Sequence, residues 1–298
     1  MAYDKIIECV PNFSEGRDQK KIEQIVECFR GKEGVKLLDY SSNADHNRTV
    51  VTVAGDPKLL AEAVLCAIGK AQQLIDLNQH KGEHPRMGAT DVVPFIPIKN
   101  VTEQEAIDLS KYVGLEMWKR FNIPVFLYEK SASAPKRQNL ADVRRGQFEG
   151  MKEKMLLPDW TPDFGENHPH ETAGVTAVGC RMFLVAFNVN LDTPDVELAS
   201  KIAKRVRFVG GGLRFVKALG IMLDERNIAQ VSMNLTDYTR TPVYMAMEMV
   251  RMEAKRFGVN VIGSEIIGLV PQQALIDCAE YYLQIEDFKH NQILENNI

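Results

Sequence analysis

The alternation of apolar and polar positions divides the first half of the chain into short elements. Residues 5–10, 35–40 and 49–53 predict strands, because apolar side chains dominate or alternate along them. Helices are predicted around 22–29 and 57–75, where apolar residues recur on one face. The predicted order is strand, helix, two strands and helix, and a further strand follows.

The second half of the chain repeats this order. Strands are predicted at 182–190, 216–223 and 228–235, and helices open near 194 and 242. Strand, helix, two strands, helix and strand is the split βαβ plan of a ferredoxin-like unit. The pattern therefore predicts that the chain uses this plan twice.

These elements predict an α+β fold of two ferredoxin-like (split βαβ) subdomains. The segment 130–175 is rich in Ser, Pro, Gly and charged residues, which favours loop over regular structure. We expect the boundary directly after it, with one subdomain at 1–180 and the other at 181–298.

Composition narrows the class of protein. The chain has 298 residues, of which 45% are hydrophobic and 26% charged, with a formal net charge of −4. This balance gives no general attraction to nucleic acid or to anionic lipid. No apolar run approaches the roughly 18–20 residues that cross a bilayer, and the first residues lack a signal-peptide layout. We expect a cytoplasmic protein with small-molecule substrates.

Metal binding is not indicated. The five cysteines are scattered and form no C-x-x-C or Cys/His cluster. His80 and His84 have the spacing of two ligands on a helix turn, but Gly82 and Pro85 argue against a helix there. We therefore expect no metal site.

The segment 79–91 concentrates the residues best suited to acid–base chemistry. His84 precedes Pro85, which biases its backbone toward extended geometry in a loop. A histidine there can act near neutral pH, with Glu83 or Asp91 tuning it. Judged by spacing alone, a surface loop with a capping histidine is the simpler explanation.

Two other polar groups suggest ligand contacts. The glycine-bounded segment 163–174 leads into the second half, and a plain linker is the alternative explanation. Asn188 and Asn190 lie two apart on a strand, so both amides point to one face. Either a ligand-binding face or a solvated sheet face would produce that pattern.

Several motifs resemble those of the glutamate formimidoyltransferase family, and the likeness spans nearly the whole chain. They occupy residues 8–16, 47–50, 82–92, 162–165, 183–191 and 268–271. The resemblance implies a folate-dependent transferase with two α/β subdomains whose sheets stack, helices outside, and a homodimer that binds folate in a cleft. It implies tetrahydrofolate as co-substrate and His84 as the catalytic residue that moves a proton.

The resemblance also implies a folate-binding stretch. It comprises Gly165, Glu166, Asn167, His168, Pro169, His170, Glu171, Thr172, Ala173 and Gly174, and its middle differs from the animal family members. Substrate carboxylates need cationic partners, for which we favour Arg48 and Arg86. Asp39, near the end of a predicted strand, is a candidate to orient His84.

Two related activities stay open at this point. The first moves a formimidoyl group between N-formimidoyl-L-glutamate and N5 of tetrahydrofolate. The second is a folate-recycling reaction, in which a formyl group passes from 5-formyltetrahydrofolate to glutamate through the same loops. A folate-binding protein without turnover is the third interpretation.

Overall fold

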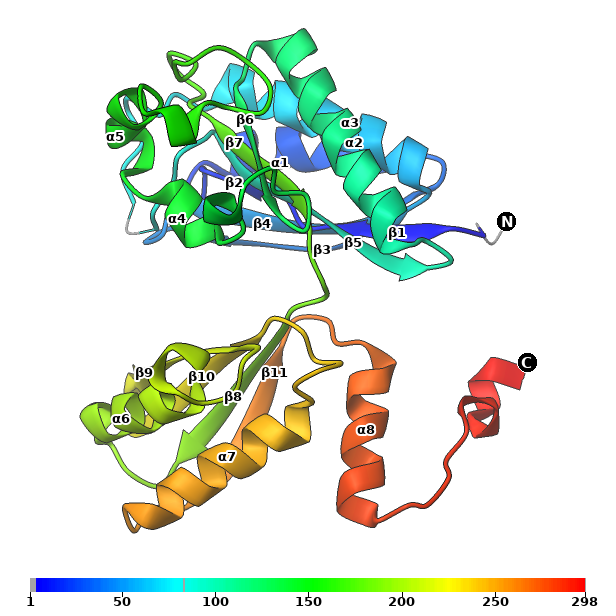
Figure 1. Cartoon of the computed structure of the whole chain (residues 1–298), viewed down its shortest axis with the longest axis vertical. Coiled ribbons are helices and arrows are strands. Elements are labelled where there is room, and N and C mark those ends of the chain that lie inside the picture. Colours follow the sequence, from blue (N-terminus) through cyan, green and yellow to red (C-terminus); the bar gives the residue numbers. More distant parts are fainter. Residues whose placement is uncertain (1–3, 83, 298) are drawn as a thin grey trace. The chain divides into compact units, whose positions relative to one another are not determined.

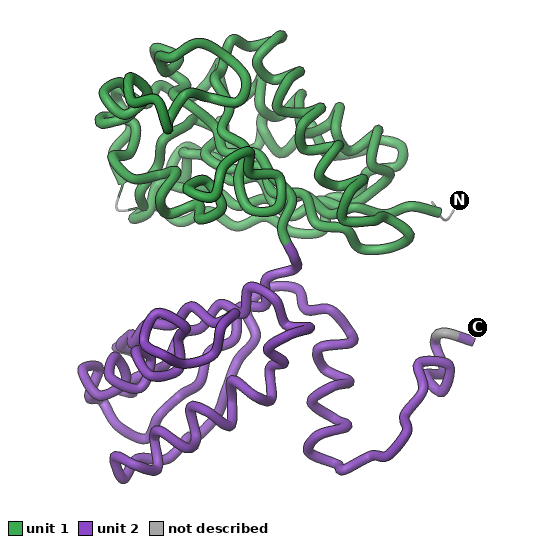
Figure 2. The backbone as a smooth tube through the Cα atoms, viewed as in Figure 1, with its two compact units in different colours: residues 1–181 green, residues 182–298 purple. Residues whose placement is uncertain are grey.

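Two separate β-sheets organise the chain, one in each half. In the computed structural model, which describes residues 4–82 and 84–297, the chain divides into two compact units at 1–181 and 182–298 (Figure 2). Each unit combines one sheet with its own helices (Figure 1). The prediction of an α+β fold is confirmed.

The sheet of the N-terminal unit contains a split βαβ arrangement and is wider than predicted. Its strands are β1 (Ile6–Cys9), β2 (Asn12–Phe13), β3 (Val35–Asn43), β4 (Arg48–Gly55), β5 (Thr90–Lys99), β6 (Val125–Glu129) and β7 (Thr176–Cys180). The pairings β5–β1, β1–β4 and β4–β3 form the ferredoxin-like part. β7 and β6 extend it beyond β5 as parallel strands.

Three helices cover one face of this sheet: α1 (Gln19–Val26), α2 (Pro57–Leu74) and α3 (Glu103–Phe121). Side-chain caps mark the starts of α2 and α3, since Asp56 caps α2 and Thr102 forms a capping box with Glu105. Val51 and Val53 of β4 face this core. Arg48, Val50 and Thr52 therefore face the opposite side.

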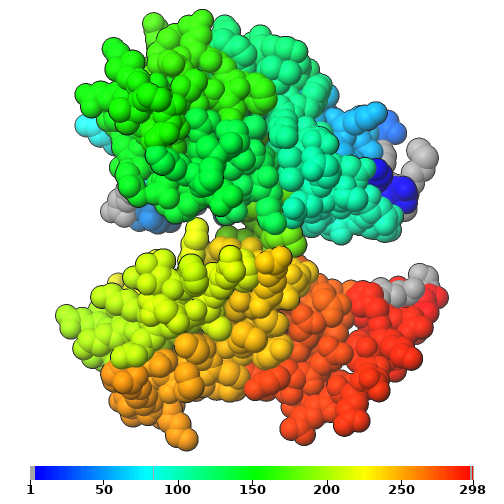
Figure 3. Space-filling model, viewed as in Figure 1, coloured from blue at the N-terminus to red at the C-terminus, as the bar shows by residue number. Residues whose placement is uncertain are grey.

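The opposite side of β6 and β7 is covered by residues that the pattern assigned to loop. The structure places α4 (Leu140–Arg144) and α5 (Gln147–Lys154) there, so that prediction was wrong in part. Val143 and Met151 pack with Phe126 and Tyr128 in a second, smaller core. In the space-filling view this segment forms much of one surface of the unit (Figure 3).

The C-terminal unit is the simpler ferredoxin-like unit. Its strands are β8 (Val185–Leu191), β9 (Val216–Leu223), β10 (Ile228–Leu235) and β11 (Val261–Ile267), and its helices are α6 (Val196–Val206), α7 (Val243–Arg256) and α8 (Gln272–Leu283). The sheet order is β11-β8-β10-β9, all antiparallel. Both strands of the predicted hairpin, β9 and β10, have the expected bounds, whereas α8 was not expected.

Candidate active site

Three loops of the N-terminal unit meet around the side chain of Asn47. Its Oδ1 accepts a hydrogen bond from the Gly16 backbone N–H at 2.8 Å, and its Nδ2 donates to the Lys81 carbonyl at 3.0 Å. The Asn47 carbonyl also lies 2.8 Å from His80 Nε2. One buried amide thus joins the loop after β2, the β3–β4 connection and the loop before β5.

Two glycines allow these loops to approach so closely. A Cβ on Gly16 would lie 2.3 Å from the Asn43 carbonyl oxygen, and a Cβ on Gly82 would lie 2.4 Å from that of His46. Neither distance accommodates a side chain, so only glycine fits at these two positions. Both glycines belong to the family-like motifs of the sequence.

His84 lies at this junction next to Arg48, the first residue of β4. Arg48 Nη1 is 3.4 Å from His84 Nδ1, and the ring of His46 stands perpendicular to the His84 ring at 6.2 Å between centroids. His84 Nε2 and Arg48 Nε are buried, and neither has a hydrogen-bond partner among the described residues. Unpartnered buried donors of this kind are rare and need an explanation.

The surroundings hold His84 in its neutral form. Burial, followed by the positive charges of Arg48, Arg144 and His46, lowers the pKa of His84 to about 3. Burial and Arg144 likewise lower the pKa of Arg48 to about 10. Because Arg48 remains a cation that donates toward Nδ1, the single proton of neutral His84 belongs on Nε2. The sequence alone suggested an ordinary histidine pKa near 6.5.

Arg144 joins this group from α4, in the segment predicted as loop. Its Nε donates to Asp91 Oδ2 at 2.8 Å, while Asp91 Oδ1 accepts from the Met87 backbone N–H at 2.8 Å. Asp91 is therefore an anchor that ties Arg144 to the loop carrying His84. Sequence analysis missed Arg144, because no periodicity or motif distinguishes it from the neighbouring Arg145.

Arg86 is occupied by internal partners. Its two terminal nitrogens donate to both carboxylate oxygens of Glu149 at 2.6 and 2.8 Å. Its Nε donates to His80 Nδ1 at 3.1 Å. A substrate carboxylate would have to displace Glu149, so the geometry favours a structural role for Arg86 over the expected substrate contact.

The stretch Gly165–Gly174 runs beside the His84 loop. The Ala89 N–H donates to the Ala173 carbonyl, and the Val175 N–H donates to the Met87 carbonyl, each at 2.9 Å. Gly174 has a φ of +67°, which favours glycine in this close approach. The structure therefore places the two predicted segments next to each other.

Side chains within this stretch divide into internal and exposed ones. His170 Nδ1 accepts from the backbone N–H groups of Thr172 and Ala173, so this ring braces its own loop. Glu166 and His168 are exposed and lie 2.8 Å apart, and Glu166 raises the pKa of His168. Glu166, His168 and their exposed neighbour Asn167 are thus open to a ligand.

Asp39 shares a sheet face with Arg48. It pairs with Thr52 across the β3–β4 hairpin, and Thr52 and Arg48 point to the same side of β4. Four residues of strand separate them, about 13 Å at 3.3 Å per residue. Among the described residues no hydrogen bond joins Asp39 to His84, and Glu83, the other proposed tuning group, lies outside the described residues.

In the C-terminal unit, Asn188 and Asn190 belong to a buried polar row. Asn188 Nδ2 donates to Glu265 Oε1 at 3.1 Å, and Gln230 Nε2 donates to Asn190 Oδ1 at 2.7 Å and to Glu265 Oε1 at 2.8 Å. Gln230 is fully buried, and its Oε1 has no partner among the described residues. These hydrogen bonds fix the side chains of the row in place, and Gln230 Oε1 is left as an acceptor without a partner among the described residues.

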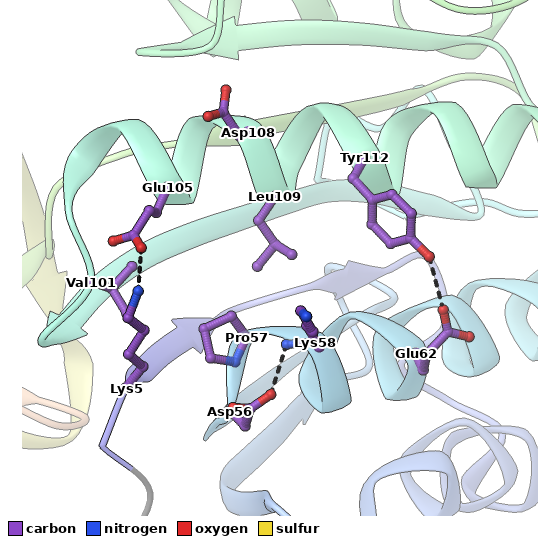
Figure 4. Close-up of a pocket in the computed structure, with 10 residues that line it drawn as sticks. All are labelled: Lys5, Asp56, Pro57, Lys58, Glu62, Val101, Glu105, Asp108, Leu109 and Tyr112. Atoms are coloured by element: carbon purple, nitrogen blue, oxygen red, sulfur yellow. Dashed lines mark hydrogen bonds and ion pairs between the residues drawn. The ribbon is translucent and has the colours of Figure 1, made fainter.

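A separate cavity of about 720 Å³ lies between the start of α2 and α3 (Figure 4). Glu62, Glu105 and Asp108 are among its lining residues, and Lys5 and Tyr112 already bond to two of these carboxylates. A cavity rich in carboxylates repels anionic ligands. The cavity therefore suits an anionic ligand less well than the His84 junction does.

The described part of the chain lacks two kinds of feature. No three His, Cys, Asp or Glu side chains there lie close enough together to hold a metal ion. None of the described helices is both long and apolar enough to span a membrane.

The α+β fold sets a neutral histidine beside two guanidinium groups, an arrangement suited to acid–base chemistry on small anionic molecules. Residues 6–181 match the family model described as the formiminotransferase domain, N-terminal subdomain, and residues 186–297 match that of the formiminotransferase domain. The chain belongs to the formiminotransferase domain family.

Curated relatives agree with this assignment. The chain is 56% identical over 295 residues to a glutamate formimidoyltransferase of Streptococcus pyogenes serotype M1, with 99% of each chain covered. It is 43% identical to a glutamate formimidoyltransferase of Thermoplasma acidophilum, covering 98% of this chain and 97% of that one. It is 42% identical to a formimidoyltransferase-cyclodeaminase of Mus musculus, of which it spans 53%.

Proposed function

We propose that this chain is a glutamate formimidoyltransferase, which moves a formimidoyl group between N-formimidoyl-L-glutamate and N5 of tetrahydrofolate. The observation that carries the proposal is His84, neutral and with an unpartnered Nε2, beside Arg48 at the junction of the family-like loops. The near full-length identity to proteins of that name supports it.

His84 suits this transfer because the reaction exchanges one amine for another on an amidine carbon. Tetrahydrofolate supplies the incoming nitrogen as co-substrate. An incoming amine must lose a proton and a departing amine must gain one, which a single imidazole can do in turn. Neutral His84 can donate its Nε2 proton to the departing amine, and its Nδ1 can accept a proton once Arg48 turns from Nδ1 to stabilise negative charge on the substrate.

We assign the remaining candidate residues by their exposure and their face of the sheet. Gly165–Gly174 binds folate through its backbone and its exposed residues Glu166, Asn167 and His168. Asp39 contacts substrate on the same sheet face as Arg48. Asn188 and Asn190 are candidate substrate contacts on the sheet of the C-terminal unit, while Arg86 stabilises the His84 loop.

We further propose that the two compact units act as the formiminotransferase subdomains of a cytoplasmic homodimer. The division at 181/182 lies close to the boundary expected after residue 180. The location and the dimer rest on the family resemblance and on the ordinary charge and composition of the chain. Sedimentation of the purified protein tests the dimer directly.

The test of function uses two reaction mixtures. In the first, the purified protein receives N-formimidoyl-L-glutamate and tetrahydrofolate, and in the second 5-formyltetrahydrofolate and L-glutamate, while the folate absorbance spectrum is followed. We expect turnover in the first mixture that His84→Ala abolishes. Turnover only in the second would replace the proposal with formyl transfer, and folate binding without turnover in either would leave a binding protein.

A further inference from the structure

Arg144 and Arg145 are adjacent but lie in opposite environments. The Arg144 side chain is 15% exposed and forms an ion pair with the buried Asp91. The Arg145 side chain is 79% exposed and bonds to Asp142 on its own helix. Burying a guanidinium has a large desolvation cost, so the position of Arg144 needs a reason that Arg145 does not share.

Among the described residues around His84, positively charged side chains outnumber carboxylates. Arg48 comes from β4, His46 from the β3–β4 connection and Arg144 from α4, and all three disfavour protonation of His84. Asp91 of β5 is the carboxylate that also acts on Arg48, and Arg144 already binds it directly. One guanidinium, that of Arg48, has no carboxylate of its own among the described ion pairs. This arrangement is suited to an anionic ligand.

Substrate chemistry selects which anion fits. In N-formimidoyl-L-glutamate the α-carboxylate and the reacting nitrogen are bonded to the same carbon. If His84 reaches that nitrogen, the α-carboxylate must lie within a few ångströms of the imidazole, where Arg48 Nη1 is 3.4 Å from Nδ1. The carboxylates of the folate tail are far from N5 and do not meet this condition.

We propose that Arg144 and Arg48 together bind the α-carboxylate of the glutamate substrate, an inference that rests on the proposed function. Asp91 positions Arg144 for this contact by holding its Nε while it also holds the His84 loop at Met87. Arg144 is then a substrate-binding residue from a segment without any family-like motif.

The same contact activates His84. An α-carboxylate that accepts hydrogen bonds from Arg48 draws this donor away from Nδ1 and neutralises the positive charge nearby. The pKa of His84 then rises from its low value in the free protein, so the imidazole becomes able to take up a proton only when substrate is present. Proton transfer is thereby coupled to occupancy of the site.

The test compares two substrates that differ in the α-carboxylate alone. N-formimidoyl-L-glutamate has this group, and N-formimidoyl-4-aminobutyrate lacks it. We expect Arg144→Gln to raise KM for the first substrate roughly 10- to 100-fold, the range for losing hydrogen bonds to a charged group. With the second substrate the change should stay below about threefold, because the contact is already missing. Arg144→Lys should restore part of the affinity.

Arg145→Gln is the matched control and should behave as the unmodified protein. An unchanged KM for tetrahydrofolate shows that Arg144→Gln still folds, and urea unfolding measures the stability lost when the buried Asp91 loses its ion pair. Equal losses with both substrates, or an Arg144→Gln protein that matches the Arg145→Gln control, would overturn the proposal.

A binding measurement separates this proposal from the proposed function. Calorimetry with L-glutamate and with 4-aminobutyrate requires no turnover. If the unmodified protein fails to transfer the formimidoyl group, the proposed function falls. A preference for L-glutamate that Arg144→Gln removes would still support the carboxylate site, and the absence of any preference would refute it.

Discussion

The loop before β5 contains two histidines, and each of them contacts an arginine. The two pairs differ in how many of their nitrogen atoms have hydrogen-bond partners. His80 and Arg86 form one pair, joined at 3.1 Å, and Arg86 also binds both oxygens of Glu149. His84 and Arg48 form the other, in a single long contact of 3.4 Å with one unpartnered buried nitrogen on each side chain. The hydrogen-bonding groups of the first pair have partners, whereas those of the second pair are only partly satisfied.

This difference shows why residue type alone does not identify a site. Both imidazoles belong to the polar segment before β5 and both are half-buried, and burial is the largest cause that lowers the pKa of each. A saturated pair contributes to stability, because its donors and acceptors satisfy one another. A pair with free buried donors and surplus positive charge is costly in the free protein and gains when an anion binds.

The largest expected effect separates the two histidines. We expect His84→Ala to lower kcat by about 10²- to 10⁴-fold, the usual contribution of a general acid–base residue. His80→Ala removes a brace between loops and should lower the free energy of unfolding by about 1–2 kcal/mol, with a much smaller change in kcat. Steady-state kinetics and urea unfolding of both variants check this, and equal kinetic losses would erase the distinction.

Arg48 and Arg86 should differ as the two histidines do, one affecting substrate binding and the other stability. Arg48→Gln is expected to raise KM for N-formimidoyl-L-glutamate by roughly 10- to 100-fold, because a charged substrate contact is lost. Arg86→Gln should instead lower the free energy of unfolding by about 1–3 kcal/mol, since His80 and Glu149 lose their partner. If Arg86→Gln raised KM for N-formimidoyl-L-glutamate without lowering the free energy of unfolding, Arg86 would instead be a residue that binds the substrate carboxylate.

The pH dependence of kcat/KM reports the free protein and sharpens the contrast. The pKa of His84 lies near 3 in the folded protein, below its usual value, so His84 stays unprotonated as pH falls through 6.5. We expect kcat/KM to hold its value well below pH 6.5. In Arg48→Gln the acid limb should move upward, because one cause of the lowered pKa is gone. An acid limb of kcat/KM with a midpoint at pH 6.5 in both the unmodified protein and Arg48→Gln would contradict this prediction.

The same shift has a consequence for stability, with a definite sign. Below pH 6.5 the unfolded chain protonates His84 while the folded protein does not, so acid favours the unfolded state. Replacing His84 with Asn should reduce the loss of stability between pH 6.5 and pH 4. Thermal unfolding across this range, compared with the unmodified protein, measures the effect.

Asp39 is expected to give the smallest change. It is exposed on β3 and about 13 Å along the hairpin from Arg48, so it should not control the protonation of His84. Asp39→Asn should leave the acid limb of the pH profile in place and change the KM of a substrate by a few-fold at most. Asp45→Asn, an exposed neighbour, is the control. A displaced limb in the Asp39 variant alone would restore the orienting role.

Local signals in the chain were sufficient for much of the fold. The apolar alternation of β9 and β10, the Asp56 cap of α2 and the capping box of Thr102 depend on residues close in sequence. The predictions of secondary structure were wrong where packing between residues distant in sequence determines the structure. Val143 and Met151 hold α4 and α5 against β6 and β7, although neither short helix has a strong periodic pattern. Polar residues 41–43 extend β3, because an edge strand tolerates them.

The sequence by itself determined the fold class, the family resemblance and His84 as the candidate acid–base residue, because these rest on residue patterns that are local along the chain. Only the tertiary structure decided which charged groups surround His84. Arg48, Arg144 and Asp91 come from three distant segments, and burial, followed by the electrostatic effects of Arg48, Arg144 and His46, lowers the pKa of the imidazole. Burial and charge depend on distances in space, which no pattern along the sequence encodes.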